Sequence, residues 1–187
     1  SGFPRQPGMS RDDLLLKNMA IVGQVTEELV KRSPDSTLII LTNPMDAMAQ
    51  LAYTVSGFPK NRVIGQGGLL DTARYRTFIS WELDVATEDV AGFVLGGHGD
   101  TMVPVPSFTS ISGVPVTQLI SSDRLDSIVE RTAGGGGEIV SLLKNGSAFE
   151  APGEAVGVCQ GSVLGLQQNQ QVTDRVVHRE VLQMEAL

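Results

Sequence analysis

The sequence of 187 residues is 41% hydrophobic and 19% charged, with a formal net charge of −7, a composition typical of a globular chain that forms one domain or parts of two. The acidic balance disfavours nucleic acid and anionic membrane surfaces as partners, and no segment approaches the ~18 unbroken apolar residues of a membrane helix. The single cysteine, Cys159, excludes an internal disulfide framework. Because the N-terminus lacks the basic and apolar regions of a signal peptide, we expect a cytoplasmic chain.

Helices and short buried strands alternate over the first 66 residues. Apolar residues at helical spacing predict a helix from Ser10, in capping-box spacing with Asp13, to about Arg32. "STLIILTNP" (36–44) is typical of a buried strand that ends in a turn. A second helix over 46–56, capped by Gly57, and a second strand in "NRVIGQ" follow. This rhythm predicts an α/β fold with a parallel sheet.

The second half of the chain mixes helices with several β segments. "GGLLDTARYRTFISWEL" (67–83) predicts a helix, "EDVAGFVLGG" (88–97) one strand, and "TMVPVPSFTSISGVPV" β structure with proline-marked turns. Residues 122–143 have a helical pattern that "AGGGGE" interrupts, since each glycine costs about 1 kcal/mol relative to alanine inside a helix. Past Pro152 no clear pattern is readable.

His98 stands out because it follows two glycines at the end of an apolar run, in "AGFVLGGHGDTMVP" (91–104). Loops after the strands of α/β sheets usually carry ligand sites, and an imidazole can accept and return a proton near neutral pH. Asp71, in "GLLDTARYR", is a candidate partner that would fix one ring nitrogen so that the other faces a substrate. Taken singly, His98 also fits a loop residue bonded to its own turn, and Asp71 a carboxylate at a helix start.

Three arginines and an asparagine are candidate binding residues. Arg74 lies one helical turn beyond Asp71 and is suited to bidentate binding of a carboxylate. Arg5 and Arg11 flank a segment with Pro and Gly that could close over an anionic substrate. Asn43, at the carboxyl end of a predicted strand, could donate to a carbonyl oxygen. Each also fits a plain structural role, as a surface or loop charge or as a turn-forming Asn before Pro.

Other chemistries have little support in the sequence. Two histidines, one cysteine and no close ligand spacing argue against a metal site. The four glycines at 134–137 lack the Lys-Ser/Thr ending of a phosphate loop. No G-x-S-x-G elbow supports a serine hydrolase. We therefore predict a site without metal.

Taken together and in order, four motifs resemble the lactate/malate dehydrogenase family, most closely its lactate-dehydrogenase-like malate dehydrogenase branch. They are "PRQPGMSRDDLLLKN", "LTNPMDAM", "GQGGLLDTARYRTFI" and "VLGGHGDTMVPVP", and the resemblance runs from residue 1 through about "GSAFEAP" at 146–152. It implies an α/β fold: the C-terminal part of a Rossmann-like NAD-binding domain over 1–66, then part of an α+β substrate domain over 67–150. Residues 151–187 are left as an unassigned tail.

The resemblance implies an NAD-dependent oxidoreductase that interconverts malate and oxaloacetate. His98 would accept the proton when malate is oxidised, Asp71 would hold its imidazole, and Arg74 would bind the carboxylate beside the reacting carbon. Arg11 would polarise the carbonyl oxygen of oxaloacetate. Arg5 would pair with the second carboxylate of the four-carbon diacid, which lactate lacks. The positions that match contacts to NAD are Asn18, Leu41, Thr42 and Asn43, of which Asn43 also reaches substrate.

Two departures from the family keep alternatives open. The glycine-rich phosphate turn and the acidic ribose-binding residue are absent from this sequence, and no closing helix or strands are recognisable after Pro152. The sequence does not begin with Met, and we expect a piece of a longer protein that forms a homodimer or homotetramer. The alternatives are an L-lactate or other 2-hydroxyacid dehydrogenase, distinguished chiefly by Arg5, and a non-catalytic truncated remnant. The remnant would associate through an exposed apolar stripe along residues 15–29.

Overall fold

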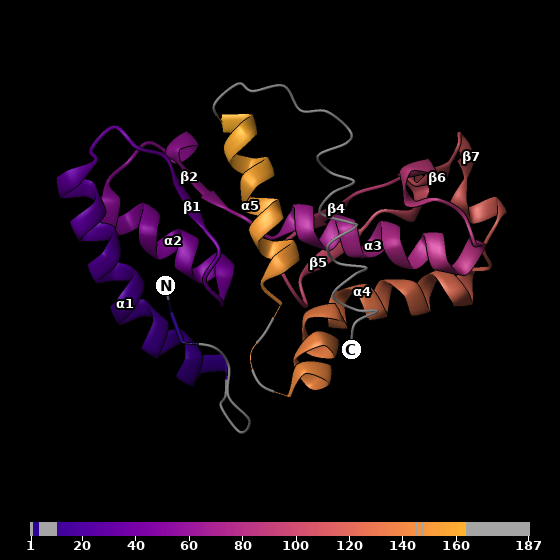
Figure 1. The fold of residues 1–187 in the computed structure, drawn as a ribbon, viewed down its shortest axis with the longest axis horizontal. Coiled ribbons are helices and arrows are strands. Elements are labelled where there is room, and N and C mark those ends of the chain that lie inside the picture. The colour runs from indigo at the N-terminus through magenta and orange to yellow at the C-terminus, as the bar shows by residue number, and fades with distance from the viewer. Residues whose placement is uncertain (1, 4–10, 145, 147, 164–187) are drawn as a thin grey trace. The chain divides into compact units, whose positions relative to one another are not determined.

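The computed structural model describes residues 2–3, 11–144, 146 and 148–163. The chain divides into two compact units, Ser1–Gln66 and Gly67–Leu187, whose elements are labelled in Figure 1. Each unit has buried apolar side chains of its own. Within the described ranges, no helix combines the length and apolar character that crossing a membrane requires.

The first unit is a two-stranded parallel sheet with two helices packed in series. Helix α2 packs against both strands, and α1 packs against α2 (Figure 1). The strands pair in parallel with Leu38 opposite Val63, as the alternation of helix and strand predicts. The elements in chain order are α1 (Arg11–Arg32), β1 (Leu38–Ile40), α2 (Met45–Ser56), the short 3-10 helix η1 (Lys60–Arg62) and β2 (Val63–Gly65).

The expected helix ends in the first unit are confirmed where they are described. Helix α1 carries acidic residues in its first turn and basic residues in its last, which complements the helix dipole. Gly57 ends α2 with a φ of 63°, and its N–H donates to the carbonyl of Tyr53, the left-handed cap that glycine adopts without strain. The capping residue expected at Ser10 lies outside the described residues.

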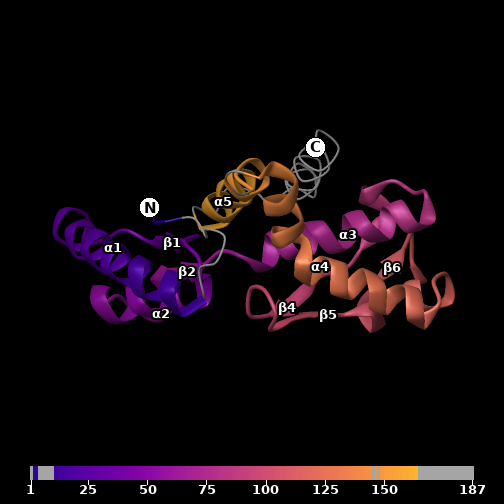
Figure 2. The same cartoon turned by 90° about the horizontal axis from the view of Figure 1, so that it is seen from below.

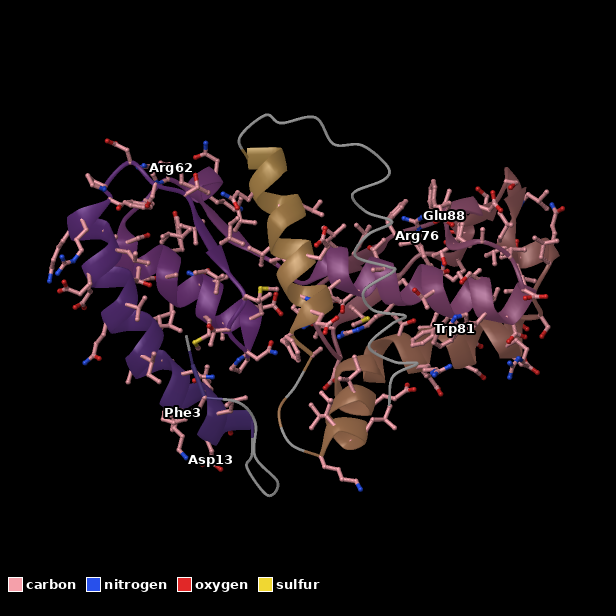
Figure 3. All side chains as sticks on the ribbon, viewed as in Figure 1. Phe3, Asp13, Arg62, Arg76, Trp81 and Glu88 are labelled. Carbon is pink, nitrogen blue, oxygen red and sulfur yellow. The ribbon has the colours of Figure 1, made fainter. Side chains whose placement is uncertain are left out.

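Arg62 ties the start of β2 to the turn that precedes β1 (Figure 3). Its guanidinium donates to the carbonyls of Pro34 and Ser36 at 3.0 and 3.4 Å, and it lies 4.3 Å from the centre of the Phe58 ring. These contacts hold the two strand starts together and support the parallel register.

The second unit is built around α3, a helix that is buried on nearly all sides between residues 70 and 80. Helices α4 and α5 and the β4–β5 hairpin contact it (Figure 2). Every strand pair that the structure describes in this unit is antiparallel. The elements are α3 (Gly68–Leu83), η2 (Thr87–Asp89), β3 (Val90–Ala91), β4 (Val94–Gly96), β5 (Met102–Pro104), η3 (Pro106–Phe108), β6 (Ser110–Ile111), β7 (Val114–Pro115), η4 (Val116–Gln118), α4 (Ser122–Leu143) and α5 (Glu150–Val163).

The single strand expected over 88–97 is wrong. The segment forms two short strands that belong to different sheets, because β3 pairs with β6 and β4 with β5. Between them Gly92 lies against Thr109, whose Cγ2 would be 3.0 Å from a Cβ at that position. The N–H of Val94 then donates to Thr72 Oγ1 at 3.0 Å. These contacts with a neighbouring loop and with α3 break the strand.

The interruption expected at the glycine run of 133–138 is also wrong, because α4 is continuous across it. Thr132 and Ile139, on either side of the run, are fully buried. Arg131 Nη2 and Glu138 Oε1 pair across the run at 2.7 Å, and the guanidinium of Arg131 lies 4.2 Å from the centre of the Phe78 ring. Tertiary packing therefore offsets the low helix propensity of the glycines.

Helix α5 begins at Glu150 and covers the first part of the tail, 151–187, that the sequence left unassigned. Its small residues Ala151 and Ala155, together with Val158, pack on Leu70 and Ala73 of α3. Because two of these three contact residues are alanines, which give only a weak apolar signal, the helical pattern was not readable from the sequence.

Replacing Glu138 by Gln is expected to lower the free energy of unfolding by about 0.5 kcal/mol near neutral pH, the usual contribution of an exposed ion pair. Hydrogen bonding to Arg131 lowers the pKa of the Glu138 carboxyl below its ordinary value. A lowered folded-state pKa stabilises the protein above the unfolded-state pKa, and this stabilisation is lost as pH falls through the lowered value. Urea unfolding near neutral pH and in acid measures the difference.

The difference between the wild type and Glu138→Gln should therefore disappear in acid. Glu130→Gln, which alters an exposed carboxylate on the same helix, is the matched control and should leave stability unchanged at both pH values. An effect of Glu138→Gln that persists in acid at full size would contradict this account.

Candidate active site

Asp71, which is buried, and His98, which is half-buried, form a pair within the second unit. Asp71 lies in the first turn of α3, and His98 lies in the turn between β4 and β5. Asp71 Oδ2 is 2.8 Å from His98 Nδ1, and the two side chains are 1% and 18% exposed. A carboxylate at this distance accepts a hydrogen bond from Nδ1–H, which leaves the lone pair of a neutral imidazole on Nε2. The pair can therefore present an oriented proton acceptor.

Arg74 lies one helical turn after Asp71 and is also buried. Its Nη1 is 3.5 Å from Asp71 Oδ1, and its side chain is 4% exposed. The guanidinium offsets the carboxylate charge in a place where a lone buried charge is costly. Of the residues expected from the sequence, Asp71, Arg74 and His98 are thus the three that the second unit brings together.

The absence of a side chain at Gly67 makes room for the imidazole of His98. The sequence did not indicate a role for this position. A Cβ at Gly67 would lie 2.8 Å from both Cβ and Cγ of His98, closer than carbon atoms approach. The carbonyl of Gly67 also accepts the N–H of Asp71 at 3.0 Å. The glycines beside Asp71 in "GQGGLLD" were the signal that could have identified this close approach.

The turn that carries His98 belongs to an antiparallel hairpin and not, as expected, to the end of a strand in a parallel α/β sheet. Gly96 and Gly99 have φ values of 81° and 98°, which favour glycine. The N–H of Gly97 donates to the carbonyl of Thr101 at 3.2 Å, and that of Met102 to the carbonyl of Gly99 at 3.0 Å. Gly96 and Gly99 therefore form the hairpin turn that places the His98 ring against α3.

In the first unit, Asn18 connects two segments that are distant in sequence. Its Oδ1 accepts the N–H of Phe3 at 2.7 Å, and its Nδ2 donates to the carbonyls of Phe3 and Asn43 at 3.2 and 2.6 Å. The side chain is fully buried. Asn18 therefore fixes the turn that carries Asn43, while the side chains of Leu41 and Asn43 are exposed and that of Thr42 is half-buried.

Gln66 is a second position that the sequence reading missed. It follows β2, its N–H donates to the carbonyl of Ile40 at 2.9 Å, and its side chain is 3% exposed. Neither Nε2 nor Oε1 of this buried amide has a hydrogen-bond partner among the described residues. A buried amide without partners is costly, which marks Gln66 as a group that would gain from a polar ligand.

The side chains of Arg5 and Arg11, two of the expected binding residues, lie outside the described part of the structure. Arg5 lies outside the described residues, and Arg11 is described only as the first residue of α1. The roles expected for them remain predictions.

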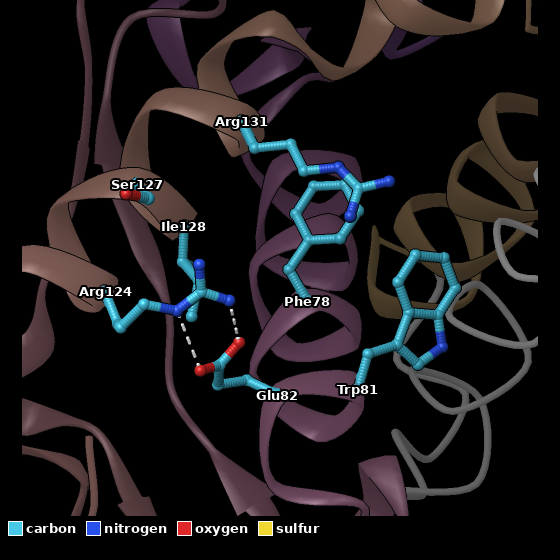
Figure 4. Close-up of a pocket in the computed structure, with 7 residues that line it drawn as sticks. All are labelled: Phe78, Trp81, Glu82, Arg124, Ser127, Ile128 and Arg131. Carbon is cyan, nitrogen blue, oxygen red and sulfur yellow. Dashed lines mark hydrogen bonds and ion pairs between the residues drawn. The ribbon is translucent and has the colours of Figure 1, made fainter. Parts of the chain in front are cut away.

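A cavity of about 260 Å³ between α3 and α4 does not include the Asp71–His98 pair (Figure 4). Arg124 and Glu82 pair across one side of it, and Arg131 stacks on Phe78 and Trp81 at the other. Hydrogen bonding to Arg124 lowers the pKa of Glu82. Because both arginines already have carboxylate partners, the cavity offers an anion little net charge.

Both parts of the chain match a known family. Residues 1–65 match the description "lactate/malate dehydrogenase, NAD binding domain", and residues 69–186 match "lactate/malate dehydrogenase, alpha/beta C-terminal domain". The second match continues past residue 152, where the sequence reading found no recognisable family pattern. These matches confirm the expected fold class.

Several relatives carry the name malate dehydrogenase. One from Rhodopirellula baltica is 60% identical over 155 residues, which are 83% of this chain and 49% of that protein. One from Salinibacter ruber is 56% identical over 164 residues, or 88% of this chain and 52% of that protein. The chain thus spans about half the length of the curated relatives it matches.

Solved structures of malate and lactate dehydrogenases have the same fold. The apo malate dehydrogenase of Picrophilus torridus has a TM-score of 0.84 at 50% identity, over 88% of this chain and 51% of that one. A lactate dehydrogenase of Cryptosporidium parvum, solved with lactic acid and NAD, has a TM-score of 0.81 at 38% identity, over 86% of this chain and 53% of that one. With both of its parts matched in this way, the chain belongs to the lactate/malate dehydrogenase family.

Proposed function

We propose that this chain carries the proton-transfer and substrate-binding part of an NAD-dependent malate dehydrogenase, which interconverts malate and oxaloacetate. The observation that carries the proposal is the hydrogen bond between Asp71 and His98, at 2.8 Å, with side chains that are 1% and 18% exposed. The malate dehydrogenase relatives support the choice of reaction.

We further propose a cytoplasmic homo-oligomer, for which the exposed apolar residues of α1 offer a contact surface: Leu16, Met19, Val25 and Leu29.

His98 is the proposed proton carrier. When malate is oxidised, the hydroxyl proton moves to Nε2 of His98 while the hydrogen on C2 leaves as hydride. Asp71 keeps the proton of the neutral ring on Nδ1 and stabilises the imidazolium that forms. In the reverse direction the same Nε2–H protonates the oxygen of oxaloacetate.

Arg74 is the proposed ligand of the carboxylate beside the reacting carbon. Its planar guanidinium can form two parallel hydrogen bonds with a carboxylate. The ion pair with Asp71 and the contact of the Arg74 side chain with α4 restrict the position of the guanidinium. This restriction limits the conformational entropy lost when a carboxylate binds. Arg11 is proposed to polarise the reacting carbonyl oxygen, and Asn43 to donate to the same substrate.

The residues of the first unit fit the nicotinamide end of NAD. The chain segments after β1 and β2 lie at the carboxyl edge of a parallel sheet, where α/β folds bind nucleotides. Leu41, Thr42 and Asn43 lie at this edge, Asn18 fixes their turn, and the buried amide of Gln66 has unused donors and acceptors among the described groups. When bound, NAD supplies the hydride acceptor. Calorimetric titration of the 187-residue chain with NAD tests this assignment.

Replacing Arg5 by Gln is expected to shift substrate preference away from the diacid. Loss of a charge-assisted pair with the second carboxylate should lower kcat/KM for oxaloacetate by roughly 10- to 100-fold, while kcat/KM for pyruvate stays level or rises. The measurement is NADH oxidation by a fusion protein that we call the completed chain. It consists of this sequence preceded by the part of the Rhodopirellula baltica relative that lies before the aligned residues. Lys17→Gln, which removes another cation from the same region, is the control.

The unsubstituted completed chain decides between the proposal and its alternatives. Faster turnover of oxaloacetate than of pyruvate supports a malate dehydrogenase. Faster turnover of pyruvate would assign a lactate dehydrogenase, and no turnover of either, with no NAD binding, would leave a non-catalytic remnant.

A further inference from the structure

Gly135 lies directly against the side chain of Arg74. A Cβ at Gly135 would be 2.9 Å from Arg74 Cδ, 3.3 Å from Nε and 3.8 Å from Cζ. Both residues are buried, and Gly135 lies on the face of α4 that packs on α3. The middle of the arginine side chain, and not its flexible end, thus occupies the space that any other residue at 135 would need.

The other glycines of the run have no such contact. A Cβ at Gly134 or at Gly137 would meet nothing within 4 Å, and one at Gly136 would meet Arg74 Nη1 at an ordinary 3.8 Å. Four glycines in a helix interior are unfavourable, and Gly135 has neither a positive φ nor a place at the end of α4 that would favour glycine. The close approach of Arg74 is the physical reason for it.

We infer that Gly135 is a positioning residue for the proposed carboxylate site: the missing side chain at 135 sets where the Arg74 guanidinium lies, and so which carboxylate substrate fits. The inference rests on the proposed function for its substrate, while the contact between Gly135 and Arg74 stands by itself. A larger residue at 135 would push the Arg74 side chain away from the wall of α4 and change its pairing with Asp71.

Gly135→Ala in the completed chain is the direct test, with Gly134→Ala and Gly137→Ala as matched controls. All three gain the same helix propensity, and only the first introduces a clash. Gly135→Ala should raise the KM for oxaloacetate about tenfold, as expected for the loss of about one charge-assisted hydrogen bond, with a smaller change in kcat. The controls should leave both constants unchanged. Equal constants for Gly135→Ala and Gly134→Ala would overturn the inference.

Two measurements on the 187-residue chain do not depend on turnover. The ¹⁵N–¹H resonance of Arg74 Nε should move in Gly135→Ala and stay in place in both controls. In an Arg74→Ala background the clash is gone, so Gly135→Ala should raise Tm as much as Gly134→Ala does. An unmoved resonance, or a fall in Tm in that background, would show that Gly135 does not act through Arg74. If the wild-type completed chain turns over no substrate, the proposed function fails, and these two measurements still decide the role of Gly135.

Discussion

Replacing His98 by Asn is expected to lower kcat of the completed chain by roughly 10³-fold or more, the loss typical for removal of a general base. Asparagine keeps a polar group in the β4–β5 turn but cannot take up a proton on the atom that faces substrate. His98 is half-buried and its ring packs close to Gly67, so the smaller side chain fits without backbone movement. NADH oxidation with saturating oxaloacetate gives kcat directly.

The chain offers a chemically matched control for this prediction. His178 is the other histidine of the sequence, and His178→Asn should retain the wild-type kcat. Thermal unfolding of both variants checks that each remains folded. Equal losses of kcat in His98→Asn and His178→Asn would contradict the role proposed for His98.

Replacing Arg74 by Leu is expected to lower the free energy of unfolding by about 3 kcal/mol, because it leaves a buried carboxylate without its cation. Asp71 is 1% exposed and Arg74 lies 3.5 Å from it, and His98 remains as a hydrogen-bond partner. The same change should remove measurable binding of oxaloacetate, because leucine cannot bind a carboxylate. Urea unfolding of the 187-residue chain measures the first effect, and the KM of the completed chain the second.

A second substitution separates the charge effect from simple loss of packing. In Asp71→Leu/Arg74→Leu both buried charges are gone, and stability should recover by about 2 kcal/mol relative to Arg74→Leu alone. A double variant that is less stable than Arg74→Leu would show that packing, and not the uncompensated charge, causes the loss.

The sequence predicted the local elements better than the contacts between them. Apolar spacing and the cap at Gly57 were enough for α1 and α2, because local propensity and burial agree there. The pairing of Asp71 with His98 joins residues separated by 27 positions, and no local pattern determines such a contact. Order and spacing of the motifs indicated both residues, but only the fold gives the distance between them.

The two wrong predictions have the same cause: tertiary packing overrides the secondary-structure preference of the local sequence. The glycine run in α4 reads as a break because glycine has low helix propensity, yet Arg74 requires the missing side chain at Gly135. The segment 88–97 reads as one strand because its apolar residues are continuous, yet Thr72 and Thr109 hold its two halves in different sheets. In both places the deciding neighbour lies far away in the sequence.

The most direct test of the central claim is oxaloacetate-dependent oxidation of NADH by the completed chain, measured for the wild type and for His98→Asn side by side. The account predicts turnover by the wild type and a loss of roughly 10³-fold in kcat on the substitution, with folding unchanged. Turnover that survives His98→Asn at the wild-type rate would contradict it, because the Asp71–His98 pair could then not be the proton carrier.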